Sequence, residues 1–164
     1  MIARTTPASV TLLAAVVAGV GGCAGARLPG TEIQSTPETR AISTALEAYR
    51  SALERRDAAT ILALAAPDYF DNAGTPDPND DLDRAGLERQ LPRDLTALDS
   101  LKVLMTLRRI DVNDKAGTAE AEVFFEQFYR VQTPNGLVAR RDADVQRFHL
   151  RRVGEQRWLF ASGL

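Results

Sequence analysis

The sequence predicts an α+β domain in which helices come first and a strongly curved antiparallel sheet follows. Between residues 38 and 98, apolar side chains recur every three to five positions, as they do on amphipathic helices. From residue 101 to the end they alternate with polar ones, as in half-buried strands. The alternation changes phase inside three successive strands, which β-bulges would explain, and bulges bend a sheet. Helices followed by a run of strands are typical of the α+β class.

Composition excludes several functional classes. The 164 residues suffice for one domain, and 45% hydrophobic with 26% charged residues is typical of a globular protein. A net charge of -2 provides no basic surface for nucleic acid. The chain has one cysteine and one histidine, so it cannot form an intrachain disulfide, and the usual zinc ligands are nearly absent. We therefore expect no cofactor, no metal and no nucleic-acid partner.

Residues 1–22 are typical of a secretion leader. Arg4 is their only charged residue, and the apolar stretch that follows, Val10–Val20, is too short to span a membrane. It runs into Val20-Gly21-Gly22-Cys23, which resembles the bacterial lipobox, where the cysteine thiol receives diacylglycerol. A single free thiol in an exported protein would otherwise be a reactive group. We therefore expect Cys23 to be lipidated with acyl chains such as palmitate.

Acylation would anchor the protein stably, because several acyl chains bind a membrane firmly, whereas a single chain binds it only weakly and reversibly. The resemblance implies a lipoprotein of the cell envelope, and Ala24 favours the periplasmic face of the outer membrane if the host is Gram-negative. The alternative is cleavage after Ala26 at an ordinary signal-peptidase site, which would release a soluble domain. Residues 23–37 contain Gly, Pro, Thr and Ser without periodicity, so we expect a flexible tether before a domain of residues 38–164.

The first helix is marked by its start and by one apolar stripe. Thr36 suits the N-cap and Pro37 suits the first helical position. Asp57 is expected to cap a short second helix, which Pro67 ends. The stripe of the first helix, at spacings of three and four, consists of Ile42, Leu46, Tyr49 and Leu53.

A loop separates the second helix from the third. Residues 68–71 suit a short first strand, and residues 72–81 (NAGTPDPNDD) must be a loop. This acidic loop lacks the alternating ligands of an EF-hand, so we expect a solvated loop and not a calcium site. Asp80 or Asp81 should cap the third helix, and Pro92 should kink or split it.

The clearest turn signal in the second half is Pro134-Asn135-Gly136. A two-residue loop at Asn135-Gly136 predicts that Val123 faces Phe148 on the apolar side of the hairpin and that Glu122 faces His149 on the wet side. Arginines of the return strand then face glutamates of its neighbour. We therefore expect cross-strand charge pairing and not an anion site.

The order of these elements resembles the NTF2-like cone fold. A long helix, a short helix running into LAAPDYFD, a third helix, and long bent strands that finish on RRVGEQRWLFASG are similar to its SnoaL-like and DUF4440-type branch. The resemblance covers residues 38–164 and consists of patterns, so it implies the fold more than an activity. Members include ketosteroid-isomerase-like enzymes, polyketide cyclases, and domains that bind small molecules or proteins.

The resemblance also implies where a site would lie. In the isomerase branch, a tyrosine of the first helix polarises a carbonyl and an aspartate after the second helix moves the proton, and Tyr49 and Asp71 stand in loosely matching places. Tyr49 also belongs to the apolar stripe, and Asp71 borders a loop, so packing and solvation explain both without catalysis. The candidate pocket residues are Tyr49, Tyr69, Asp71, Tyr129, Asp142, Asp144 and Trp158.

Two arrangements are open for Asp142 and Asp144. With an unbroken hairpin they would form a polar rim of a pocket; with a bulge they would turn to solvent, which we expect. We therefore expect a binding or assembly module of the cell envelope, with a small apolar ligand or a protein partner and a homodimer through the sheet. One alternative is a small-molecule enzyme of the ketosteroid-isomerase or polyketide-cyclase type. Another is a structural envelope protein whose pocket is filled by its own side chains.

Overall fold

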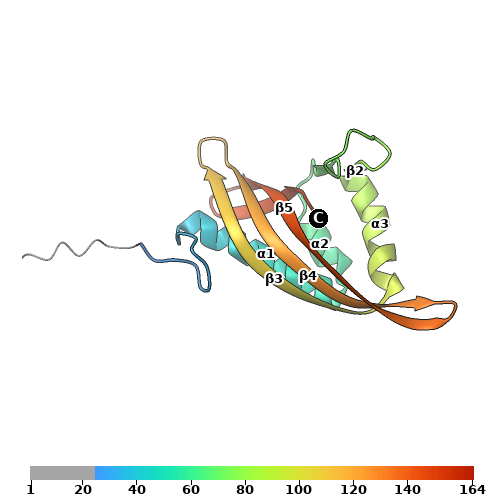
Figure 1. The fold of residues 1–164 in the computed structure, drawn as a ribbon. Coiled ribbons are helices and arrows are strands. Elements are labelled where there is room, and N and C mark those ends of the chain that lie inside the picture. The colour runs from blue at the N-terminus through green and yellow to red at the C-terminus, as the bar shows by residue number, and fades with distance from the viewer. Residues whose placement is uncertain (1–24) are drawn as a thin grey trace, which may run out of the picture.

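The computed structural model describes residues 25–164 and has the predicted α+β architecture (Figure 1). The leader and Cys23 lie outside the described residues, so lipidation stays a prediction. Within residues 25–164, no helix combines the length and the apolar character that a membrane crossing requires. The elements are α1 (Pro37–Arg55), α2 (Ala58–Leu64), β1 (Phe70–Asp71), β2 (Leu82–Asp83), α3 (Arg84–Ala97), β3 (Leu98–Asn113), β4 (Thr118–Thr133), β5 (Gly136–Val153) and β6 (Arg157–Ser162).

The predicted start and buried face of α1 are confirmed. The Thr36 hydroxyl accepts the Thr39 N–H at 3.2 Å, and the Thr39 hydroxyl accepts the Thr36 N–H at 2.9 Å, which closes a capping box. Asp57 caps α2 as expected, because its carboxylate accepts the Thr60 N–H at 3.0 Å. All four stripe residues of α1 are buried, in one core with apolar side chains of the sheet.

The sheet has the strand order β3-β4-β5-β6, and every neighbouring pair is antiparallel. A register shift between Leu107 and Arg109 confirms the bulge that the phase change in β3 predicted. Two further shifts lie between Leu98 and Ser100 in β3 and, where β5 pairs with β6, between His149 and Leu150. Such shifts bend a sheet, and Figure 1 shows the long strands curving past α1. The helix therefore fills the concave side.

The hairpin between β4 and β5 differs from the prediction by two residues. The loop is Pro134-Asn135, and Thr133 pairs with Gly136, so Ala121 faces Phe148, where we expected Val123. The Thr133 hydroxyl holds this turn, because it donates to the Gly136 carbonyl at 2.7 Å and accepts the Asn135 N–H at 3.3 Å. A shift of two keeps every side chain on its predicted face, since the side-chain period of a strand is two.

The third helix starts later than expected. Asp83 is its N-cap and accepts the Gly86 N–H at 2.6 Å, so the prediction of Asp80 or Asp81 was wrong. The reason is the short ribbon between β1 and β2, which holds the chain extended until Asp83. Pro92 does not split the helix, which continues from Arg84 to Ala97. Only Leu87 and Leu95 of this helix are buried, so most of its surface faces solvent, where a lost backbone hydrogen bond is replaced by water.

The expected tether is an ordered turn from Ala26 on. Arg27 forms an isolated antiparallel bridge with Gln34, and the Ser35 N–H donates to the Ala26 carbonyl at 2.7 Å. Leu28 and Ile33 are both buried, so their side chains pack against the domain. Burial of two large aliphatic residues opposes free movement. The folded body therefore begins about ten residues before the predicted boundary at residue 38.

Candidate functional site

An open hollow of about 770 Å³ lies between β5, the loop that follows β1, and the last residues after β6. Carboxylates dominate its charged lining, and apolar groups from Phe125 and Val145 form a smaller share. The lining residues used below are Asp71, Phe125, Gln127, Asp142, Asp144, Val145, Gln146 and Gly163.

Asp71 holds the end of the chain in place. One carboxylate oxygen accepts the Gly163 N–H at 2.7 Å and the Tyr69 hydroxyl at 3.3 Å, and the other accepts the Ala73 N–H at 2.9 Å. The Tyr69 hydroxyl in turn accepts the Leu164 N–H at 3.0 Å. Burial raises the pKa of Tyr69, and the adjacent Asp71 carboxylate raises it further, so the hydroxyl stays protonated at neutral pH.

Asp142 and Asp144 form the rim of the hollow on β5. The register of β4 with β5 runs without a shift from Thr118–Arg151 to Thr133–Gly136, so the bulge expected in this hairpin is absent and the expected rotation away from the hollow was wrong. Both carboxylates remain exposed to solvent all the same. The arrangement is therefore the polar rim that an unbroken hairpin implies.

Each rim carboxylate has one partner on its own hairpin. The Tyr129 hydroxyl donates to Asp142 Oδ2 at 2.6 Å, a hydrogen bond that raises the pKa of Tyr129. The Val145 N–H donates to Asp144 Oδ1 at 2.7 Å. Tyr129, a candidate pocket residue, is thus bonded to the rim but is not itself part of the lining.

Tyr49 and Trp158 lie in the core and not in the hollow. The Tyr49 ring packs against Phe125, Phe148 and Phe160, with ring centroids 6.2, 5.6 and 5.6 Å away. Burial raises the pKa of Tyr49, so its hydroxyl does not ionise at neutral pH. Trp158 is 2% exposed. The structure therefore does not bring Tyr49 and Asp71 together at one open site.

Two further residues of the site, Gln146 and Gly163, were not among the seven candidate pocket residues. Gln146 donates from Nε2 to the Gly163 carbonyl at 2.5 Å and so ties β5 to the last residues. Gly163 has φ +96°, and a Cβ there would lie 2.6 Å from the Arg147 carbonyl oxygen. A glycine in a final apolar strand is the only sequence signal for such a close approach.

The charged outer face of the hairpin confirms the expected cross-strand pairing. Arg141 donates to Glu126 at 2.6 Å, and Arg147 lies 3.7 Å from Glu122. His149 lies 3.9 Å from Glu120, which follows from the two-residue difference in register. These arginine charges are therefore neutralised by glutamates of β4.

The acidic loop bonds largely to itself. Thr75 donates to Asp80 at 2.7 Å, and Asp77 accepts the Asn79 N–H at 3.0 Å. Across residues 25–164, no group of three His, Cys, Asp or Glu side chains is placed to hold a metal ion. The described loop is thus a set of local side-chain turns.

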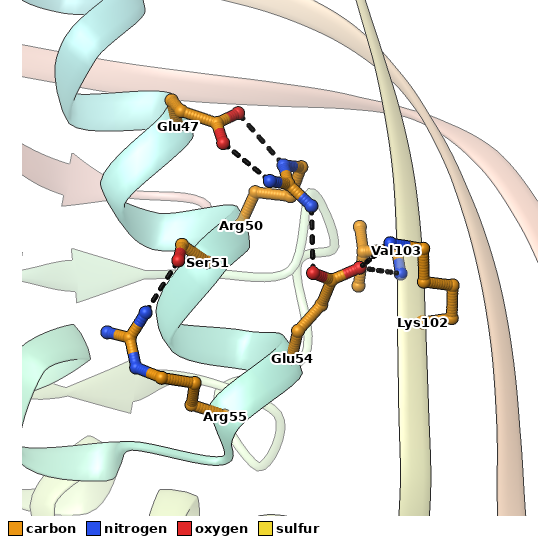
Figure 2. A network of polar contacts seen from close by, with 7 residues as sticks. All are labelled: Glu47, Arg50, Ser51, Glu54, Arg55, Lys102 and Val103. Carbon is orange, nitrogen blue, oxygen red and sulfur yellow. Dashed lines mark hydrogen bonds and ion pairs between the residues drawn. The ribbon is translucent and has the colours of Figure 1, made fainter.

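A separate polar network joins α1 to β3 on the other side of the molecule (Figure 2). Glu54 accepts the Val103 N–H and the Lys102 ammonium, each at 3.0 Å, and pairs with Arg50 at 2.9 Å. The hydrogen bond from the Val103 backbone lowers the pKa of Glu54, and Lys102 and Arg50 lower it further. Arg50 also binds Glu47 at 2.8 Å. This network docks the helix on the sheet edge and lines no hollow.

No protein-family model matches the sequence, and no curated protein is significantly similar to it. A putative dehydratase from the NTF2-like family of Streptomyces avermitilis is 17% identical, with a TM-score of 0.58 over 76% of this chain and 92% of that one. A ketosteroid isomerase-like protein from Erwinia carotovora atroseptica is 19% identical, with a TM-score of 0.62 over 76% and 92%. A protein with a cystatin-like fold from Caulobacter vibrioides is 22% identical, with a TM-score of 0.57 over 78% and 87%. The chain therefore has the NTF2-like, cystatin-like fold.

Proposed function

We propose that this chain is an exported, lipid-anchored domain that binds a ligand in the hollow and does not catalyse a reaction. The observation that carries the proposal is the acidic rim. Asp71, Asp142 and Asp144 border one open hollow, and none of them forms an ion pair with a residue in the described range 25–164. Unpaired carboxylates around a concavity concentrate cations there. The hollow therefore suits a positively charged ligand.

The placement of the aromatic and acidic groups supports binding over proton transfer. A general base of the isomerase kind needs a free carboxylate beside the reacting carbon and a hydroxyl that polarises the carbonyl. Asp71 already accepts three hydrogen bonds that hold the chain end. Tyr49 packs in the core, away from the lining.

The alternative, a small-molecule enzyme, has one observation in its favour. The buried Tyr69 hydroxyl contacts Asp71, which lines the hollow, at 3.3 Å. Two proteins of the same fold are named for a dehydratase and for ketosteroid isomerase. The binding domain and the enzyme can be distinguished by incubating the protein with a 3-keto-Δ5 steroid and measuring the absorbance of the conjugated product. Turnover that Asp71→Asn abolishes would establish the enzyme.

The position of Cys23 supports a short membrane tether. Ala26, three residues later, is already hydrogen-bonded in the ordered turn. Three residues span at most about 11 Å, so an acylated Cys23 would hold this end of the domain close to the bilayer. The turn lies beside Ile110 and Val112, near the β3–β4 turn, and Figure 1 shows the β4–β5 hairpin tip at the opposite end. The hollow would then open into the aqueous space.

The ligand expected from the sequence was small and apolar, and Phe125 and Val145 offer it some apolar wall. The homodimer through the sheet also stays a proposal. On the outer face, Leu104 and Phe128 are 49% and 39% exposed, and no helix covers them in the described part of the chain. Sedimentation of wild type and a Leu104→Lys/Phe128→Lys variant tests it, because charges would dissociate a dimer through this face.

Two measurements test the main proposal. The intact mass of membrane-extracted protein should match a chain that begins at an acylated Cys23, and Cys23→Ala should abolish that species. A soluble product that begins at Arg27 would refute the anchor. Calorimetric titration with spermidine should give binding that 1,8-octanediol does not reproduce and that Asp142→Asn/Asp144→Asn weakens. Equal heats for both compounds would refute an acidic binding hollow.

A further inference from the structure

We propose that the outer edge of β5, from Arg141 to Val145, binds an extended basic segment of a partner protein as an added strand. This inference rests on the proposed function of the hollow, and it names the class of partner. It depends on the strand position next to β5, of which β6 occupies only one half. The β4 strand pairs with β5 along its whole length, but β6 pairs only with His149–Val153.

Beyond that point the outer side of β5 has no strand beside it in the described chain. The last residues leave the sheet after Ser162, because Asp71 binds the Gly163 N–H and Tyr69 binds the Leu164 N–H. They turn toward β1, although Gly163 still lies close to the Arg147 carbonyl and accepts a hydrogen bond from Gln146. In the described chain, the fourth position of the sheet is therefore vacant along residues 141–145, in line with β6.

The backbone groups along this stretch point outward at alternate residues. The Val145 N–H bonds to the side chain of Asp144 at 2.7 Å, so it faces away from β4. The Arg147 carbonyl also faces outward, since Gly163 approaches it closely. In an antiparallel strand, residues two apart present both backbone groups to the same side. Ala143 and Arg141 therefore offer the same donors and acceptors as Val145.

The hollow supplies the space for an added strand. Its lining includes six consecutive residues of β5, from Asp142 to Arg147, so residues of both faces of this strand border it, together with Phe125 and Gln127 of β4. The opposite wall is the loop from Asp71 to Gly74. An extended chain between these walls would pair with β5 on one side and meet Asp71 on the other. Such strand addition is an established mode of peptide recognition.

The charges select a basic partner. Asp142 and Asp144 are two residues apart, so they share one face of the edge and match a ligand with cations at alternate positions. The neighbouring Arg141 is paired with Glu126, and Arg147, which borders the hollow, is paired with Glu122. Arg140 is not part of the hollow. A lysine or arginine at every second position of the partner would meet carboxylates.

The test uses the mature protein in neutral detergent and a fluorescent peptide, acetyl-(Lys-Val)3-amide. We expect it to bind at least tenfold more tightly than acetyl-(Glu-Val)3-amide and to slow amide exchange at Ala143 and Val145. Asp142→Asn/Asp144→Asn should weaken binding about tenfold, as the loss of two ion pairs of roughly 0.5–1 kcal/mol each would. The matched control, Asp111→Asn/Asp114→Asn, removes two charges at the other end of the sheet and should leave binding unchanged.

Backbone pairing is tested separately from charge. A peptide N-methylated at alternate residues keeps every lysine but cannot form the ladder, so its affinity should fall at least tenfold. Val145→Pro removes one outward donor at an edge position that tolerates proline, and it should weaken the peptide while spermidine still binds. Unchanged binding of the N-methylated peptide would refute strand addition and leave the cation-binding hollow standing. Protection of Val145 that rises with protein concentration alone would also refute it, because a second copy would then occupy the edge.

Discussion

The two edges of the sheet are protected in different ways. Along β3, Glu54 of α1 accepts the Val103 N–H, Arg56 donates to the Leu98 carbonyl at 2.5 Å, and the N-terminal turn lies beside Val112. Along the distal half of β5, the outward Val145 N–H bonds to the neighbouring Asp144 and, among residues 25–164, to no other group. An uncovered strand edge is a template for pairing with another chain. The covered edge stabilises the domain, and the hollow lies along the open one.

The largest change in the free energy of unfolding is expected at Gly163, next to the point where the open edge of β5 begins. Gly163→Ala should lower the free energy of unfolding by about 2–4 kcal/mol, because alanine disfavours φ +96° and its Cβ would lie 2.6 Å from the Arg147 carbonyl oxygen. Urea unfolding followed by circular dichroism measures the change. The displaced backbone would also weaken the bond from Gly163 to Asp71.

Gly154→Ala is the matched control for that substitution. Its φ of +73° is also left-handed, but nothing lies within 4 Å of the added Cβ. This substitution should lower the free energy of unfolding by about 1 kcal/mol, because only the unfavourable backbone conformation of alanine contributes. Equal losses for the two variants would show that the close approach to β5 contributes nothing.

The covered edge should respond strongly to loss of its helix contact. Glu54→Ala leaves the Val103 N–H without its acceptor beside a side chain that is 1% exposed, and this should lower the free energy of unfolding by about 2 kcal/mol. Glu47→Ala removes only an exposed ion pair to Arg50 and should change it by less than about 0.5 kcal/mol. A loss at Glu54 no larger than that at Glu47 would contradict the role assigned to the network in Figure 2.

The same contact should make stability depend on pH. The Val103 hydrogen bond lowers the pKa of folded Glu54 below its ordinary value of 4.5. A carboxyl with a lowered folded pKa stabilises the protein fully above its unfolded pKa and loses this contribution as pH falls through the folded pKa. The difference in stability between wild type and Glu54→Ala should thus be constant above about pH 5.5 and shrink toward pH 3. A difference that does not shrink as the pH falls below the ordinary pKa of 4.5 would show that the contact acts through packing.

The sequence predicted local features of the fold better than the contacts that build the site. Thr36 and Asp57 were identified as caps because a cap bonds to the next turn of its own helix. The predicted register of the β4–β5 hairpin was wrong by two residues, because the hydroxyl of Thr133 fixes the turn and the Asn-Gly pair does not. The bond from Asp71 to Gly163 spans 92 residues, and no periodicity reports such a contact. The polar rim depended on the absence of a bulge, which alternation alone could not decide.

The smallest effect is expected at the open edge itself. Asp144→Ala removes the acceptor of the Val145 N–H, but both residues are exposed and water replaces the bond, so the free energy of unfolding should change by less than about 0.5 kcal/mol. The Val145 amide should nevertheless exchange several-fold faster, as measured by NMR in deuterated buffer. Glu54→Ala should accelerate exchange at Val103 as well, but together with a global loss of stability. An amide that exchanges faster without global destabilisation is what distinguishes an edge kept open for a partner from an edge that belongs to the core. Slow exchange at Val145 in the variant would mean that this edge is covered in solution, and the contrast between the two edges would fail.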